Sequence, residues 1–236
     1  MAVSRETSQG VRLGLRDSWV VAVGLVPLGL AFGLLMTQAG FAWWWTPIVS
    51  TVILAGSMEF LTIEMMLTGV GPIASAVTAF MVNFRHIFYG LTFPRHVVRG
   101  VVPKVYSTYA LTDEAYAVAS TIKGPVTGAR VLTIEGFIQL SWVLSGIVGA
   151  LVGQIIPPEL EGMDFALVAL FAVLAYDAFR AIPDFSGPLL AGGIAIVAAV
   201  LFPAQMVIVA LVAYFGIIVA RFWAPKLDDA LTWKAK

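Results

Sequence analysis

The sequence predicts an all-α polytopic membrane protein with about seven transmembrane helices. Its 236 residues are 60% hydrophobic and 12% charged, whereas about a quarter of the residues in soluble domains are charged. Long runs contain no Asp, Glu, Lys or Arg, and a membrane span needs about 20 mainly apolar residues. These uncharged runs are residues 18–58, 65–84, 136–158 and 185–220.

The expected spans follow these runs and the proline and glycine residues that separate them. Pro27 and Gly29 lie inside the first span, and we expect a kink or a break of the helix there because proline removes a backbone donor. A packing kink and a functional break are equally supported. The fifth span is short for a full crossing. The spans are residues 18–38, 47–67, 73–93, 131–156, 165–181, 188–202 and 204–222.

The chain reads as one integral membrane transporter domain, residues 1–236. Short similarities between residues 18–93 and 131–202 suggest a 3+3 inverted repeat, which is typical of secondary transporters, with an extra helix at 204–222. The polar segment 94–130 connects the two halves.

The side on which the N-terminus lies is left open. Basic connections favour the cytoplasm, which places residues 94–130 inside. Three spans before residue 94 then put the basic N-terminus outside, unless an early segment re-enters or a helix at 104–121 crosses. We otherwise expect that helix to lie at the membrane interface.

Several function classes receive no support. The net charge is zero, so nothing indicates binding of a polyanion such as nucleic acid. The apolar runs instead predict that the lipid bilayer surrounds the protein. The chain has no cysteine, which excludes thiolate metal sites. It contains no P-loop, H-E-x-x-H or G-x-S-x-G motif. We therefore expect no enzyme activity, no cofactor and no metal.

The candidate site lies in the stretch from Leu54 to Gly90, because ionisable side chains inside an apolar span mark function by default. Glu59 follows the small residues Gly56 and Ser57, where the helix can break. Glu59 either packs in the interior as a neutral, protonated acid without a functional role or, when ionised, requires a cationic partner. Glu64 lies on another face and serves better as a partner or interfacial group.

The third span adds polar groups on adjoining faces. Asn83 and His86 share one face, and Arg85 and Tyr89 share the next. Arg85 either snorkels to the interface, binds a substrate carboxylate or pairs with an acid such as Glu59. His86 supplies either a structural hydrogen bond or proton transfer. Weaker candidates elsewhere are Asp177 in the fifth span and the adjacent loop acids Asp113 and Glu114.

Four motifs resemble the AzlC/BrnF family, the large subunits of bacterial branched-chain amino-acid exporters. They are PLGLAFG from Pro27, LAGSMEF from Leu54, VNFRHIFYG from Val82 and TDEAY from Thr112. The resemblance implies an inner-membrane, multi-pass secondary transporter that exports Leu, Ile, Val and also Met, driven by the proton motive force. It also implies a small AzlD/BrnE-like membrane partner.

The chain departs from the family pattern at two positions. Leu54 replaces a usual phenylalanine, and Glu59 replaces a glutamine common in the family, although the actinobacterial BrnF-like branch is also acidic there. We hypothesise that Glu59 binds the substrate ammonium or couples protons. The alternative function is a channel or a non-transporting membrane scaffold whose buried charges are paired internally.

Overall fold

The computed structural model of the chain describes residues 2–156, 172, 176, 179, 184–224, 232 and 233. It divides into two compact units, residues 1–68 with 83–160, and residues 69–82 with 161–236. In the described residues the regular elements are helices, as predicted. The first unit contains α1 (Ala2–Gln38), α2 (Trp45–Ile53), α3 (Gly56–Leu67), α5 (Arg85–Thr92), η1 (Arg95–Val97), α6 (Val101–Tyr109), α7 (Asp113–Ser120) and α8 (Gly128–Gly153).

The second unit contains most of α4 (Pro72–Asn83) together with α10 (Ser186–Leu201), η2 (Pro203–Gln205) and α11 (Met206–Trp223). In the described part of the chain, three helices are long and apolar enough to cross a membrane: Thr7–Gln38, Gly128–Gly153 and Met206–Trp223. The last two predicted spans correspond to α10 and α11. Most of the fifth lies outside the described residues, so the count of seven stays a prediction.

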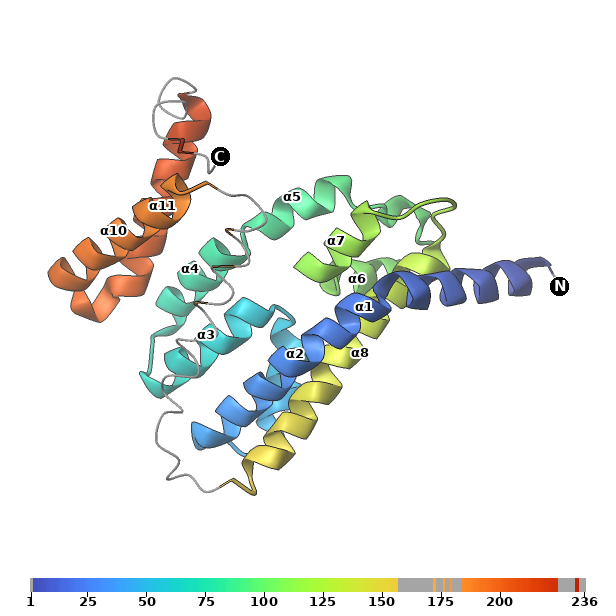
Figure 1. Cartoon of the computed structure of the whole chain (residues 1–236), viewed down its shortest axis with the longest axis horizontal. Helices are drawn as coiled ribbons and strands as arrows, with labels where there is room; N and C mark the ends of the chain where they lie inside the picture. The colour runs from blue at the N-terminus through green and yellow to red at the C-terminus, as the bar shows by residue number, and fades with distance from the viewer. Residues whose placement is uncertain are drawn as a thin grey trace. The chain divides into compact units, whose positions relative to one another are not determined.

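The first unit is organised around the pair of helices α1 and α8, which lie side by side (Figure 1). Glycines allow the two backbones to approach closely. A Cβ on Gly33 would collide with the backbone of Gly146 and Ala150, and a Cβ on Gly149 would collide with the Leu30 carbonyl. In a membrane the hydrophobic effect does not drive helices together, so they associate by close packing, which small residues at the contact allow.

Of the kink or break predicted at Pro27 and Gly29, the break is wrong, and the kink stays a prediction. Helix α1 runs without interruption from Ala2 to Gln38 with Pro27 inside it. A spanning helix tolerates the one lost backbone hydrogen bond where neighbouring helices support it. Gly29 has a different role, because a Cβ there would collide with the Ser145 side chain of α8. Gly29 is therefore a packing residue.

The two helices run in the same direction. Asp17 bonds Arg130, and Ser141 Oγ donates to the Ala22 carbonyl at 2.5 Å, so positions advance together along both helices. An inverted repeat would require its two first helices to run in opposite directions, so this parallel pair does not support the inversion. The similarity between the two halves stays a prediction, because residues 157–171 of the second half lie outside the described residues.

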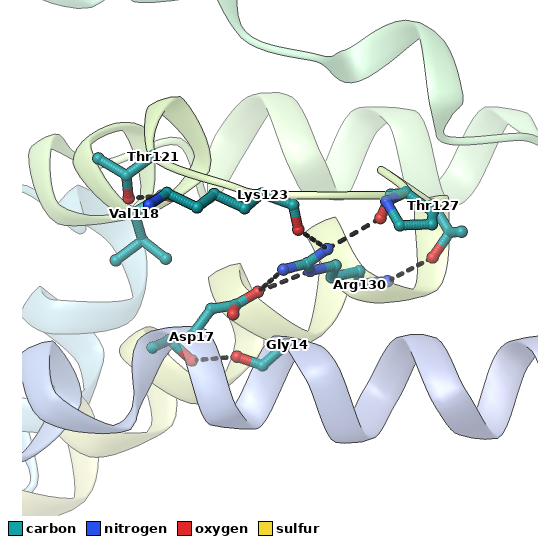
Figure 2. A network of polar contacts seen from close by, with 9 residues as sticks. Gly14, Asp17, Val118, Thr121, Lys123, Thr127 and Arg130 are labelled. Atoms are coloured by element: carbon teal, nitrogen blue, oxygen red, sulfur yellow. Dashed lines mark hydrogen bonds and ion pairs between the residues drawn. The ribbon is translucent and has the colours of Figure 1, made fainter.

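Arg130 fastens one end of this pair, as Figure 2 shows. Arg130 is 3% exposed. Its guanidinium donates to Asp17 through Nε and a terminal nitrogen, each at 2.6 Å. It also donates to the carbonyls of Pro125 at 2.9 Å and Lys123 at 3.3 Å. Thr127 caps the start of α8 by accepting from the Arg130 amide.

This contact relates the N-terminal helix to the basic connection. The start of the apolar part of α1 lies beside the end of the basic connection 94–130, so both belong to the same side of the membrane. By the positive-inside rule we expect that side to be the cytoplasm. The alternative in which 104–121 crosses does not fit, because the segment forms α6 and α7, of nine and eight residues, and neither can span a bilayer. A re-entrant early segment is the alternative that fits.

The predicted second span is broken where its small residues stand. Helix α2 ends at Ile53, Leu54 has a left-handed backbone with φ 44°, and Ala55 is extended before α3 begins at Gly56. A non-glycine residue in this conformation costs about 1–3 kcal/mol and persists only where its surroundings fix it. The predicted third span is also interrupted, at Phe84, between α4 and α5.

We predict that Gly33→Ala destabilises the protein by about 1–3 kcal/mol, because the added methyl group must push two tightly packed backbones apart. The matched control is Gly24→Ala on the same helix, where a Cβ meets nothing within 4 Å. Thermal unfolding of the two purified variants in detergent measures the difference. Equal melting temperatures for both would contradict the role of Gly33 in the α1–α8 contact.

Candidate functional site

Glu59 lies at the centre of the first unit and is fully buried. Its carboxylate accepts hydrogen bonds from Ser50 Oγ at 2.7 Å, from the Ala55 amide at 3.2 Å and from Trp142 Nε1 at 3.0 Å to both oxygens. These donors come from α2, the break and α8. All of them are neutral, so this acid is held in the apolar interior by hydrogen bonds alone.

The broken helix produces this arrangement. Ending α2 at Ile53 and restarting at Gly56 turns the Ala55 amide towards the Glu59 carboxylate, one turn further along. The missing side chain of Gly56 leaves room for the Trp142 ring, which a Cβ would approach to 3.4 Å. Phe32 stacks on the Trp142 ring with centroids 6.2 Å apart and so fixes its position.

A small cavity beside Glu59 is also lined by Glu114, from the start of α7. Apolar side chains, Thr112 and Gln139 complete its wall. Pockets for small molecules combine an apolar lining with a few polar groups in this way. Glu114, a weaker candidate from the sequence, therefore belongs to the lining of this cavity. The apolar lining residues are Leu25, Leu54, Ile138 and Trp142.

A second, more open cavity shares the lining residue Leu54 with the first. Its wall contains Asn83, His86 and Arg95. Arg95, which donates to Thr108 Oγ1 at 2.7 Å, is the basic side chain of this wall.

One hypothesis from the sequence was that Arg85 pairs with Glu59, and the structure shows a different partner. Arg85 binds Asp113 of α7 through two nitrogens, with Nε 2.9 Å from Oδ1. The two side chains are 45% and 38% exposed, which places the pair at the rim of the unit. Asp113 is accordingly an ion-pair partner and not a lone solvated acid. The helix carrying Asp113 is close to α5 in space, and sequence spacing does not show this.

The other predicted residues divide into two groups. Ser57 Oγ and Asn83 Oδ1 are buried and have no hydrogen-bond partner within the described part of the chain, so both are available to a ligand. His86 Nδ1 contacts the Asn83 carbonyl at 3.0 Å, and Tyr89 stacks on Tyr116 at 4.3 Å. Glu64 is exposed, and Asp177 lies outside the described residues.

Sequence reasoning missed three residues of the buried polar region, all on one face of α8: Glu135, Gln139 and Trp142. They recur at i, i+4 and i+7, the spacing of one helix face. The signal for Glu135 was present, because it is an ionisable residue inside the predicted span 131–156. The rule that singled out Glu59 therefore applies to Glu135 as well.

Comparison with known proteins shows which family the sequence belongs to. A model of the family described as AzlC protein matches residues 20–156, which is more than half of the chain. The chain belongs to the AzlC family. The match covers α2, α3 and most of α8, and therefore every group that binds Glu59.

Individual relatives agree with this assignment. The chain is 28% identical to the branched-chain amino acid transport protein AzlC of Bacillus subtilis, over 84% of this chain and 80% of that protein. It is also 28% identical to the inner membrane protein YgaZ of Escherichia coli, over 71% and 72%, and to an uncharacterized membrane protein of Haemophilus influenzae, over 74% and 73%. No solved structure matches.

These relatives and the apolar helices establish where the protein works. The chain is a multi-pass protein of the bacterial cytoplasmic membrane. The predicted family and location are confirmed.

We predict that Trp142→Phe lowers the stability by about 1–3 kcal/mol, because the ring still packs but no longer donates to the buried carboxylate of Glu59. Thermal unfolding followed by circular dichroism measures the loss. Trp44→Phe is the control: Trp44 is 44% exposed before α2, and such substitutions stay within about 0.5 kcal/mol. Similar shifts for both variants would refute the importance of the indole donor.

Proposed function

We propose that this AzlC family protein exports branched-chain amino acids and also methionine across the cytoplasmic membrane, driven by the proton motive force. It acts as the large subunit of a two-component carrier with a small AzlD/BrnE-like membrane protein. The Bacillus subtilis relative is named as a branched-chain amino acid transport protein, which supports the substrate class. The direction, the driving force and the partner are parts of the proposal.

The observation that carries the proposal is the buried Glu59 carboxylate beside an apolar cavity. An amino acid with an aliphatic side chain needs an acid for its ammonium and an apolar wall for its side chain. Glu59, with Glu114 across the cavity, supplies the first, and Leu25 and Ile138 supply part of the second.

The polar groups around the helix break serve the substrate carboxylate. Ser57 lies in the first turn of α3, where backbone amides point outward and the helix dipole favours an anion. Its hydroxyl is buried and has no hydrogen-bond partner among the described residues, so it can donate to a carboxylate. Arg85 is engaged by Asp113, so direct carboxylate binding by Arg85 would first require that pair to open.

A single carboxylate gives a simple basis for exchange. Glu59 holds either a proton or a substrate ammonium, because an ammonium ion is held strongly only by the ionised acid. Binding of one then excludes the other, and a proton entering the cell can replace an amino acid leaving it. A pH gradient that is acidic outside drives this cycle towards export.

The test is counterflow in proteoliposomes that contain the chain alone or with the small membrane protein encoded beside its gene. We expect preloaded leucine to draw in labelled leucine, isoleucine, valine and methionine, and a gradient to drive net movement only when both subunits are present. Labelled lysine and aspartate are control solutes. A channel would show uptake without dependence on preloading, and a scaffold would show none.

We predict that Glu59→Gln abolishes acceleration of transport by a pH gradient, with at least a tenfold loss in initial rate, because an amide cannot exchange a proton. Labelled leucine efflux with and without an imposed gradient gives the measurement. Glu64→Gln, the same substitution at an exposed acid on the same helix, is the matched control. Gradient-driven efflux that persists in Glu59→Gln would exclude Glu59 as the coupling group.

A further inference from the structure

Glu135 of α8 is a second buried carboxyl group that the site around Glu59 leaves unused. Glu135 is 1% exposed to solvent. Ser107 of α6, also fully buried, donates a hydrogen bond to Oε1 at 2.8 Å. Oε2 has no hydrogen-bond partner within the described part of the chain.

This environment does not stabilise the folded protein. An unpaired carboxyl group in the membrane interior is costly, and either glutamine or an aliphatic residue would fit with less penalty. Arg130, one turn earlier on α8, is already engaged by Asp17 of α1. On the other elements packed against α8, Asp113 is paired with Arg85. The other described cationic groups there are exposed: Arg12 and Arg16 of α1, Arg95 and His96 of η1, and Lys104 of α6. The remaining titratable groups on α6 and α7 are Tyr106, Tyr109, Glu114 and Tyr116.

Polar side chains connect the surroundings of Glu135 with those of Glu59. Tyr106 donates to Gln139 Oε1 at 2.7 Å, Gln139 Nε2 donates to Tyr109 Oη at 3.2 Å, and Tyr109 donates to the Thr51 carbonyl. Burial raises the pKa of both tyrosines, and the nearby charge of Glu135 adds to the effect at Tyr106 as that of Glu59 does at Tyr109. Each phenol therefore lies near one of the two acids.

The position along α8 gives the order of the two acids. Glu135 is five residues, or about 7.5 Å, beyond Arg130, and Trp142 is a further 10.5 Å or about two turns away. Arg130 stands at the cytoplasmic end with the basic connection, and Trp142 binds Glu59. Glu135 thus lies between Glu59 and the cytoplasm, and Gln139 lines the Glu59 cavity.

We propose that Glu135 is a second proton-binding group of the transport cycle, which receives the proton from Glu59 and releases it to the cytoplasm. The inference rests on the proposed proton-coupled function. In this step the O–H bond at Glu59 breaks and one forms at the Glu135 carboxylate, with the tyrosine hydroxyls and water in the cavity between them. Glu59 is left ionised and ready for an ammonium group, and Glu135 then loses the proton to cytoplasmic water.

The first experiment detects the proton without transport. Infrared difference spectra of the reconstituted two-subunit complex are recorded over a pH titration for the wild type, Glu135→Gln and Ser107→Ala. We expect a carboxylic acid band that titrates in the wild type, disappears in Glu135→Gln and moves to higher wavenumber in Ser107→Ala, where the carbonyl loses its donor. Identical spectra for wild type and Glu135→Gln would overturn the proposal.

The second experiment separates coupling from structure. We expect Glu135→Gln to reduce pH-gradient-driven leucine efflux at least tenfold, and Glu135→Asp, which keeps an acid, to retain most of it. Equal loss in both variants, or full coupling in Glu135→Gln, would overturn the proposal. If the wild type itself shows no gradient-driven efflux, the proposed function fails, and the infrared titration still decides whether Glu135 binds a proton.

Discussion

Close backbone contact between α1 and α8 is the constraint on which the rest of the first unit depends. The glycines at positions 29, 33 and 149 remove the side chains that would hold the two helices apart. That approach brings Phe32 against the ring of Trp142 and sets the indole where it can reach Glu59. Without it, neither the cavity nor the hydrogen bonds to the buried acid would form.

The structure treats its acids in two different ways. Asp17 and Asp113 lie towards the rim and each has an arginine partner. Glu59 and Glu135 lie deeper and have only neutral donors. An ion pair and donated hydrogen bonds both favour the charged form of a carboxylate, whereas burial opposes it. The acids with arginine partners hold segments of the fold together, and the two buried acids are the ones to which our proposals assign proton binding.

Parts of this arrangement could be predicted from the sequence, because they depend on local chemistry. The apolar runs indicated spanning helices, and the small residues before Glu59 indicated the break that the structure has at Leu54 and Ala55. The continuity of α1 through Pro27 could not be predicted, since it depends on α8 packed alongside. The same is true of Arg85, whose partner is 28 residues away on a separate helix.

The N-terminal side shows how one distant contact can outweigh a regular rule. Taking each apolar run as one crossing gives an N-terminus outside, which was one of three alternatives left open by the sequence. The contact of Asp17 with Arg130 places the first helix and the basic connection together and favours a re-entrant early segment. The broken segments α2 and α3, of nine and twelve residues, are poor crossings when taken singly, and the sequence pattern does not show this.

The α1–α8 contact also has a consequence for synthesis of the protein. The 89 residues between Gln38 and Gly128 must be made after α1 before its partner can begin to emerge. At roughly 5–20 residues per second, this takes about 4–18 s. During that interval the glycine face of α1 meets lipid or the insertion machinery in place of α8. A nascent chain paused in this region would present that bare helix surface to any other helix rich in small residues.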